Sequence, residues 1–499
     1  MACQRARGYD VGVLAPEIAE AIALFIPCAA SFERFTKALP ASATTSALAS
    51  LARLFSEPAL SIAWPNVEVR SPSLSRAAAK DLAAITALAP KRVVVSYKIE
   101  NRKDLGIVAG IAPWITELTF YLGDESLFSV IDAATWAYYR TTLASCQRLE
   151  TFVLSDCSAG YGALDGVFFD LPCLTSLTIG AYNGFDGNLQ CHVKPAFTAQ
   201  LTKWLQTQPV TTLGLDFVWF GLDPDTPKVL ALCDAISNCT TLTALRLNNV
   251  DVFAEFLNGR PLPERLKRLE WDVDDYDGTD DSQDGWDNFV AALVHGPQLQ
   301  HLGCKHLDAL MEEDDVLEKV EGLTSLEAHY VGRDVVGTLD VLQLLSNMPN
   351  LKHLQLKHSS FANETARMLF ATVCTRSRLE TFGLGSHQLE ANDARQLFQV
   401  MPHVPNWPLK HLDLSEHDFD VDDIVAMLPT MNAAIKNLQV VQLQGEWGKK
   451  ELAQFAAAVR ALPDRHFVIV PRWPHAAFRA QWSDIMPVSD TSPLCMVFV

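Results

Sequence analysis

A short hydrophobic phrase, L-x-x-L-x-L, recurs along most of the chain. It is clearest in the copies that begin at Leu351, Leu379 and Leu409, the second of which has a phenylalanine at its fourth position. From Leu323 to Leu438 the copies start at a nearly constant interval, which indicates an internal repeat. The alternating L-x-L within each copy predicts a short strand. Looser copies begin at Ile115, Leu149, Leu174, Val210, Leu242, Leu266, Leu299, Leu323 and Leu438.

The segments between these copies carry a helical pattern. Apolar residues spaced i, i+3, i+4 and i+7 lie on one face of a helix, and they occur at residues 341–348, 366–373, 394–401, 424–431 and 452–459. A single strand and helix cannot bury their own apolar faces, but stacked copies can. The diameter of a helix is larger than the spacing between neighbouring strands, so the helical side of a stack takes up more room than the strand side. We therefore expect an α/β solenoid with a curved parallel sheet inside and helices outside.

This pattern resembles the leucine-rich repeats of the ribonuclease-inhibitor-like type, whose repeats have this length and contain a full helix. The resemblance covers about residues 115–470, and the copy at Leu149 ends in Cys157, at the asparagine/cysteine position of the consensus. It implies a leucine-rich-repeat solenoid, which we expect over residues 76–480, with a C-terminal tail at 481–499. The resemblance is specific for the fold and says nothing about the ligand.

Strand alternation predicts which residues would bind a partner. Residues between the repeat leucines are expected to face the concave side of the array. His301 and His353 share a repeat position but lie two strands apart, roughly 10 Å, which is too far for one zinc ion. We therefore expect a mixed polar, protein-binding face without metal or cofactor. Its predicted protein-binding residues are Arg246, Asn248, Arg268, Glu270, His301, Lys305, Glu327, His329, His353, Gln355, Lys357, His411 and Asp413.

Residues 1–75 lack the repeat and are expected to be helical. Leu14, Glu17, Ile18 and Ile22 match the L-P-x-E-I-x-x-x-I start of the F-box at the right offsets, although the proline is displaced by one and the later V-C-K-x-W element is absent. The segment resembles a divergent F-box, which implies a substrate-recognition subunit of a cullin-type ubiquitin ligase. The alternative is a helical cap that shields the first repeat. The residues that would bind a Skp-type adaptor are Leu14, Ile18, Ile22 and Phe25.

Charge and hydropathy narrow the choice of partners. The 499-residue chain has a formal net charge of −19 and no dense basic run, so neither nucleic acid nor an anionic membrane surface is an expected partner. No stretch approaches the roughly 20 apolar residues of a membrane span, and the first residues lack an apolar signal core. The 11 cysteines include no C-x-x-C pair and are expected to be buried and reduced. We therefore expect a cytoplasmic or nuclear protein.

Sequence motifs for catalysis are missing. We find no G-x-S-x-G, no H-E-x-x-H and no Walker motif. The acidic run at residues 272–287 fits a calcium loop poorly, because aligning Gly278 with the loop glycine puts Val273 at the first ligand position, so a solvated insertion is expected instead. We therefore expect a non-catalytic protein-binding protein with no catalytic residues. The alternatives are a general interaction scaffold with a capped repeat array, or a regulator of a small GTPase.

Overall fold

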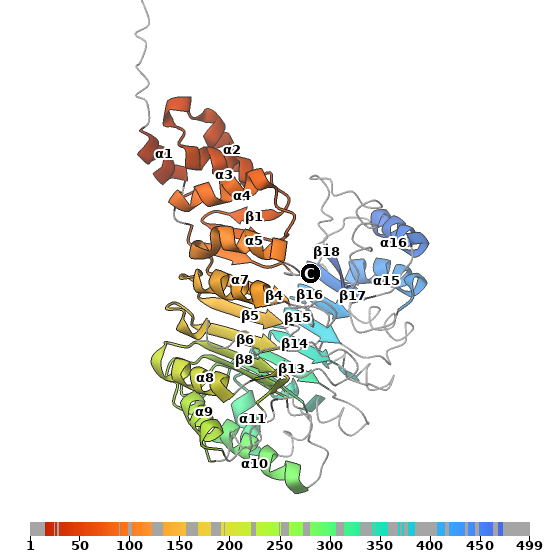
Figure 1. Ribbon diagram of the computed structural model, residues 1–499. Helices are drawn as coiled ribbons and strands as arrows, with labels where there is room; N and C mark the ends of the chain where they lie inside the picture. Colours follow the sequence, from red (N-terminus) through yellow and green to blue (C-terminus); the bar gives the residue numbers. More distant parts are fainter. Residues whose placement is uncertain are drawn as a thin grey trace, which may run out of the picture. The chain divides into compact units, whose positions relative to one another are not determined.

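The chain divides into two compact units, which are described separately. The N-terminal unit contains residues 1–242 and 249–256, and the C-terminal unit contains residues 243–248 and 257–499. Figure 1 shows the computed structural model. It describes residues 15–23, 25–26, 29–88, 90–97, 102–121, 133–155, 168–180, 191–193, 195–220, 226–248, 250, 259–272, 280–305, 314–329, 342–343, 345–357, 368–369, 372–373, 378–384, 407–414, 419–434, 438–444, 449–462 and 468–472.

The N-terminal unit is built on a sheet that begins with one antiparallel hairpin and continues as parallel strands. Strands β1 and β2 pair antiparallel, and each later neighbour pairs parallel. Strands β7 (Cys191–His192) and β9 (Val218–Trp219) form a separate parallel pair. The strands of the main sheet are β1 (Leu60–Ala63), β2 (Asn66–Val69), β3 (Arg92–Val95), β4 (Glu117–Tyr121), β5 (Thr151–Ser155), β6 (Ser176–Gly180) and β8 (Thr212–Asp216).

Helices alternate with these strands along the chain. Two of the helices have a hydroxyl residue as their N-cap: the side chain of Thr45 accepts a hydrogen bond from the backbone N–H of Leu48, and that of Ser75 accepts one from Ala78. The α-helices are α1 (Pro16–Ala23), α2 (Ala29–Ala38), α3 (Ser46–Leu54), α4 (Arg76–Ala84), α5 (Arg102–Ile111), α7 (Ala133–Ala144), α8 (Pro195–Thr207) and α9 (Pro227–Ser237). Short 3₁₀ helices lie at Ala41–Ala43, Ile85–Leu88, Ala112–Trp114 and Phe168–Asp170.

The segment before residue 76 is not helical throughout. Helices α1 to α3 lie there, as the sequence predicts, but the hairpin of β1 and β2 follows them and joins the sheet. In β2 the side chains of Val67 and Val69 are buried while Asn66 is exposed, which is strand alternation. A strand this short is too brief for that alternation to stand out in the sequence. The sheet therefore begins before residue 76.

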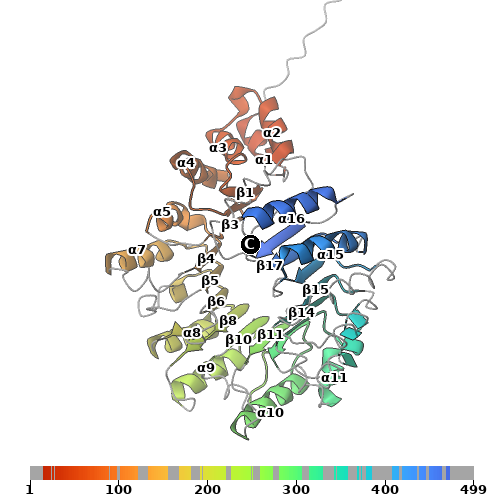
Figure 2. The same ribbon diagram turned by 90° about the vertical axis from the view of Figure 1, so that its right-hand side faces the viewer.

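The C-terminal unit contains a longer run of parallel strands. Figure 2 shows helices α10, α15 and α16 on one side of them. From β13 onward the strands start at a nearly constant interval, which matches that of the sequence repeat. The strands are β10 (Ala244–Asn248), β11 (Arg268–Asp272), β12 (His301–Lys305), β13 (Ser325–His329), β14 (His353–Lys357), β15 (Thr381–Leu384), β16 (His411–Leu414), β17 (Val440–Gln444) and β18 (Val468–Arg472). The described helices are α10 (Asp280–His295), α11 (Asp314–Val320), α15 (Val421–Ala434) and α16 (Lys449–Ala461).

One backbone hydrogen bond recurs at the entry to each strand from β11 to β17. The N–H of the residue preceding a strand donates to the carbonyl of the equivalent residue one strand earlier, and the distances lie between 2.7 and 2.9 Å. The repeated bond keeps successive copies in the same register, so equivalent side chains line up across the sheet. The bonded residues are Lys267 to Thr243, Gln300 to Lys267, Thr324 to Gln300, Lys352 to Thr324, Glu380 to Lys352, Lys410 to Glu380 and Gln439 to Lys410.

The structure confirms a mixed α/β chain with a long, mostly parallel sheet. Within β14 the side chains of Leu354 and Leu356 are buried, while Gln355 between them is only half-buried. The helices expected at 424–431 and 452–459 are present as parts of α15 and α16. Within the segment 341–348, residues 342–343 and 345–346 are helical, and within 366–373, residues 368–369 and 372–373 are helical. All of 394–401 and the tail at 481–499 lie outside the described residues.

Two further expectations concern the acidic run and the membrane. Residues 273–279 of the acidic run lie outside the described residues, and residues 280–287 belong to helix α10. Across the described segments, no helix is both long enough and apolar enough to cross a bilayer.

Candidate protein-binding face of the C-terminal unit

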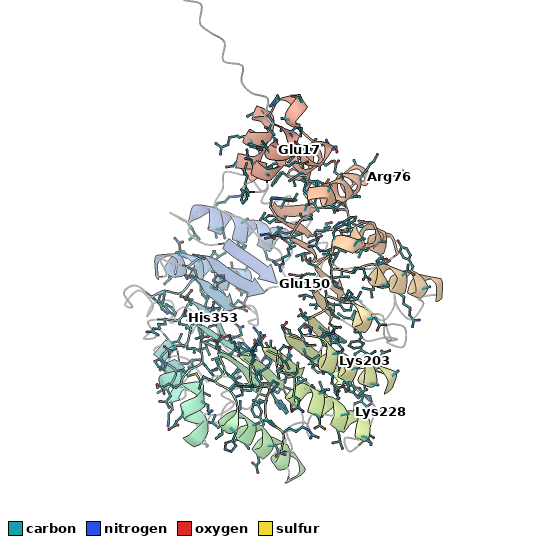
Figure 3. The ribbon with its side chains drawn as sticks, turned by 90° about the vertical axis from the view of Figure 1, so that its left-hand side faces the viewer. Glu17, Arg76, Glu150, Lys203, Lys228 and His353 are labelled. Atoms are coloured by element: carbon teal, nitrogen blue, oxygen red, sulfur yellow. The ribbon has the colours of Figure 1, made fainter. Side chains whose placement is uncertain are left out.

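The parallel register arranges the predicted binding residues in three rows across the sheet face. All thirteen fall in one of these rows, and Figure 3 marks His353 among the strands of this unit. The first row contains Arg268, His301, Ser325, His353, Thr381 and His411. The second row contains Arg246, Glu270, Gly303, Glu327, Gln355, Gly383 and Asp413. The third row contains Asn248, Lys305, His329 and Lys357.

Glu270 is the centre of a charged cluster, the Glu270 cluster, formed with Arg246, Arg268 and His301. Its carboxylate accepts from Nε of Arg268 at 2.7 Å and lies 3.2 Å from Nε of Arg246. Nε2 of His301 lies 3.5 Å away, within ion-pair range but too far for a good hydrogen bond. Burial alone would raise the pKa of Glu270, but His301 and the two arginines outweigh it and hold the pKa at about 2. The carboxylate is therefore ionised at any physiological pH.

Glu327 is held in a second, smaller cluster. Its Oε1 accepts from Nζ of Lys357 at 2.5 Å and lies 3.2 Å from Nε2 of His329. Burial opposes ionisation here too, but His329 and Lys357 together keep the pKa of Glu327 well below its usual range. Glu270 and Glu327 are thus each paired with two or more basic side chains.

Imidazole rings of the first row are anchored by hydroxyl groups on the next strand. Nδ1 of His301 lies 2.7 Å from Oγ of Ser325, and Nδ1 of His353 lies 3.0 Å from Oγ1 of Thr381. Burial lowers the pKa of His353, although the charge of Glu380 raises it, so this ring is neutral at pH 7. The two hydroxyl residues are not among the predicted binding residues, although they occupy the histidine column when the repeat copies are aligned.

Glycines at two second-row positions make room for long neighbouring side chains. A Cβ at Gly303 would lie 2.9 Å from Cγ of Glu270, and one at Gly383 would lie 1.8 Å from Oε1 of Gln355. Across Gly383, Nε2 of Gln355 donates to Oδ2 of Asp413 at 3.1 Å. The glycines therefore leave space for the side chains of the preceding strand, and at Gly383 this lets a hydrogen bond pass over the strand.

A hollow of about 280 Å³ lies on this face. Basic, acidic and amide groups share its wall, so it offers both hydrogen-bond donors and acceptors. Repeat leucines contribute only a small part of the wall, at Leu326 and Leu354. Its other lining residues are Arg268, His301, Ser325, Glu327, His353, Gln355, Lys357, Thr381 and Asp413.

Some predicted binding residues are more buried than a surface contact requires. Glu270, His301 and Lys305 are each less than a tenth exposed, whereas Arg268 and His353 are exposed and His411 lies at the start of β16 with an exposed side chain. The side chains of the first three are therefore largely covered by their neighbours. His301 and His353 are two strands apart in the register, as expected. Within the described part of the chain, no three histidine, cysteine or acidic side chains are grouped to hold a metal ion.

Helix α1 presents an unusual surface in the N-terminal unit. Its alanines, Ala19 and Ala23, are fully buried, while Ile18 is 52% exposed and Ile22 40% exposed. Phe25, just beyond the helix, is 86% exposed. A surface helix normally buries its largest apolar residues, and α1 does the reverse. Leu14, the fourth predicted adaptor-binding residue, lies outside the described residues.

Comparisons with known proteins do not assign a family. No family model matches the sequence, and no curated protein is significantly similar to it. A crystal structure of a protein from Bacteroides fragilis is 16% identical, over 65% of this chain and 75% of that one, with a TM-score of 0.29. At so low a score the similarity supports no argument about fold or function.

Proposed function

We propose that the chain is a non-catalytic, protein-binding protein built from leucine-rich repeats of the ribonuclease-inhibitor-like type. Three observations support the repeat type: the L-x-x-L-x-L phrase, the nearly constant strand interval from β13 onward, and the backbone bond repeated at the strand entries from β11 to β17. In such an array the partner binds the sheet face opposite the helices. The hollow on the C-terminal unit is the candidate binding site.

The size and openness of that hollow favour a protein partner. Sites for small molecules usually enclose about 300–1,000 Å³ and have mostly apolar walls. This one measures about 280 Å³, and its walls are mainly polar. Such a space fits one or two side chains of a partner, with the surrounding rows contacting the rest of the partner surface. This hollow is the observation on which the proposal rests.

Substituting the centre of the hollow tests the proposal. Random 16-residue peptides can be selected for binding to the intact chain. Some of the selected peptides should bind at this face. We expect Gln355→Arg to weaken their binding by roughly tenfold or more, because a larger side chain fills a space that the peptide needs. Fluorescence polarisation of labelled peptides would measure the change.

A matched arginine in the other unit is the control. Val153 is half-buried in β5, at the strand position equivalent to that of Gln355. Val153→Arg should leave peptide binding unchanged. If selected peptides bind both variants as tightly as the native chain, the hollow is not the binding site and the proposal is wrong.

We further propose that the N-terminal helices form an F-box-like segment that binds a Skp-type adaptor, which would make the chain a substrate-recognition subunit of a cullin-type ubiquitin ligase. The outward position of Ile18, Ile22 and Phe25 supports this second proposal. An amphipathic helix binds a groove by burying such a stripe. A pure cap would instead turn its large apolar side chains toward the sheet.

An Ile18→Asp, Ile22→Asp double variant should lose the adaptor. Each isoleucine buried at an interface contributes about 2 kcal/mol, so the double variant should bind about 1,000-fold more weakly or not at all. Both positions are exposed, so thermal stability and circular dichroism should not change. Co-purification of the full chain with the adaptor, followed by titration calorimetry, would measure the loss.

Met368→Asp is the matched control, because Met368 is an exposed apolar residue of the C-terminal unit. It should leave adaptor binding unchanged. A native chain that does not bind the adaptor would refute the ubiquitin-ligase proposal, and the chain would then be a scaffold with a capped repeat array.

A further inference from the structure

The Glu270 cluster presents cations to solvent and keeps its anion beneath them. The side chains of Arg246 and Arg268 are 47% and 52% exposed, whereas that of Glu270 is 9% exposed. Both guanidinium groups contact the same carboxylate, from β10 on one side and from β11 itself on the other. The solvent-exposed part of the cluster is therefore the pair of arginine side chains, and the carboxylate that pairs with both of them is buried.

One arginine of this pair lies at the edge of the hollow. Arg268 lines the hollow together with His301 and His353, whose rings are fixed by hydroxyl groups through Nδ1. Fixing Nδ1 directs Nε2 of each ring away from its anchoring hydroxyl. Arg268 and the two imidazole rings thus belong to the first row, which lines the hollow.

Each carboxylate near the hollow is already bound by another side chain. Glu270 and Glu327 are each already paired with basic side chains, and Asp413 accepts from Gln355. Three basic groups (Arg246, Arg268 and Lys357) balance three acidic ones (Glu270, Glu327 and Asp413), so an anion is favoured by the exposure of the two guanidinium groups and not by a net positive charge. Arginine binds carboxylate and phosphate groups through paired, charge-assisted hydrogen bonds, and both arginines keep half of their surface exposed for that purpose.

We propose that the arginine pair Arg246 and Arg268, with the adjoining hollow, binds an anionic side chain of the partner protein. The anion is a carboxylate or a phosphoryl group, since the same donors suit both. This inference rests on the proposed protein-binding function and adds the chemistry of the ligand. Glu270 acts as a positioning residue, because it orients both arginines and does not itself contact the ligand.

Fluorescein-labelled 12-residue peptide libraries would test this proposal. The libraries are identical except at a fixed central residue, which is glutamate, phosphoserine, glutamine or lysine. The glutamate or the phosphoserine library should bind the intact chain about tenfold more tightly than the glutamine library, and the lysine library should bind no better than glutamine. The preference should fall as salt is raised from 50 to 500 mM. Which of the two anionic libraries binds better distinguishes a carboxylate from a phosphoryl ligand.

Three variants separate ligand binding from a structural role. Arg268→Gln and Arg246→Gln should each remove most of the preference for the anionic libraries. Glu270→Gln should weaken binding of the anionic libraries, though less than either arginine variant does, because the arginines lose the carboxylate that orients them, and it should leave the affinity for the glutamine library unchanged; a merely structural role predicts an equal loss for every library. Arg92→Gln is the control, since Arg92 is equally exposed and pairs with Glu117 on the sheet of the N-terminal unit.

The outcomes also separate this inference from the proposed function. If the glutamine or lysine library binds best, and Gln355→Arg abolishes that binding, the face binds a partner but the anionic ligand is wrong. If no library binds, both proposals are wrong.

Discussion

Replacing Trp204 with alanine is expected to lower the free energy of unfolding of the N-terminal unit by about 4 kcal/mol. Trp204 lies on α8 and is almost completely buried. Its ring packs 6.0 Å from that of Phe169, centroid to centroid, and its Nε1 donates to the carbonyl oxygen of Leu174 at 3.1 Å. The alanine variant would lose all of these contacts and leave a cavity between the helix and the sheet.

A phenylalanine at the same position separates packing from hydrogen bonding. Trp204→Phe keeps most of the ring but leaves the Leu174 carbonyl without its donor, so a loss of about 1–2 kcal/mol is expected. Urea unfolding followed by circular dichroism would measure both variants. Trp219 on β9 is 39% exposed, and Trp219→Ala should cost less than about 1 kcal/mol. Equal losses at positions 204 and 219 would contradict this description of the core.

The sequence is sufficient to predict the strands and the side of the sheet on which each residue lies. A strand has a period of two, so the L-x-L within a copy determines which residues enter the core. In β14 this places Leu354 and Leu356 inward and Gln355 on the opposite face, as the structure has it. Helices were predictable for the same reason, since an apolar stripe repeats at i, i+3, i+4 and i+7, as at 424–431 in α15.

The contacts between side chains on neighbouring strands could not be predicted from the hydrophobic pattern. Glu270 contacts Arg246 from the strand before it and His301 from the strand after it. The segment between β10 and β11 is shorter than the segment between β11 and β12, so the register had to be read from the structure. The burial of Lys305 likewise depends on neighbours distant in sequence. Only the two anchoring hydroxyl residues of the first row could have been found earlier, by aligning the repeat copies in columns.

The Glu270 cluster also stabilises the fold in a pH-dependent way. The pKa of Glu270 is about 2 in the folded chain, against 4.5 for the free side chain. A carboxyl group whose pKa is lowered by folding stabilises the folded state above its unfolded pKa, and that contribution is lost as the pH falls through the folded value. A shift of this size corresponds to roughly 3 kcal/mol at pH 7. Between pH 4.5 and pH 2 the contribution should disappear.

Glu270→Gln should therefore lower the free energy of unfolding by roughly 3 kcal/mol at pH 7. Glutamine has nearly the same shape as glutamate but cannot neutralise two arginines. Urea unfolding at pH 7, 5, 4 and 3 should show a constant difference from the native chain down to about pH 5, with less than half of it remaining at pH 3. Glu33→Gln provides the comparison, because Glu33 pairs with Lys37 on the exposed surface of α2 and should show no measurable difference at any pH. A difference that is the same at pH 7 and pH 3 would mean that Glu270 stabilises the sheet through its shape rather than its charge, and that the arginines do not depend on it for their positions.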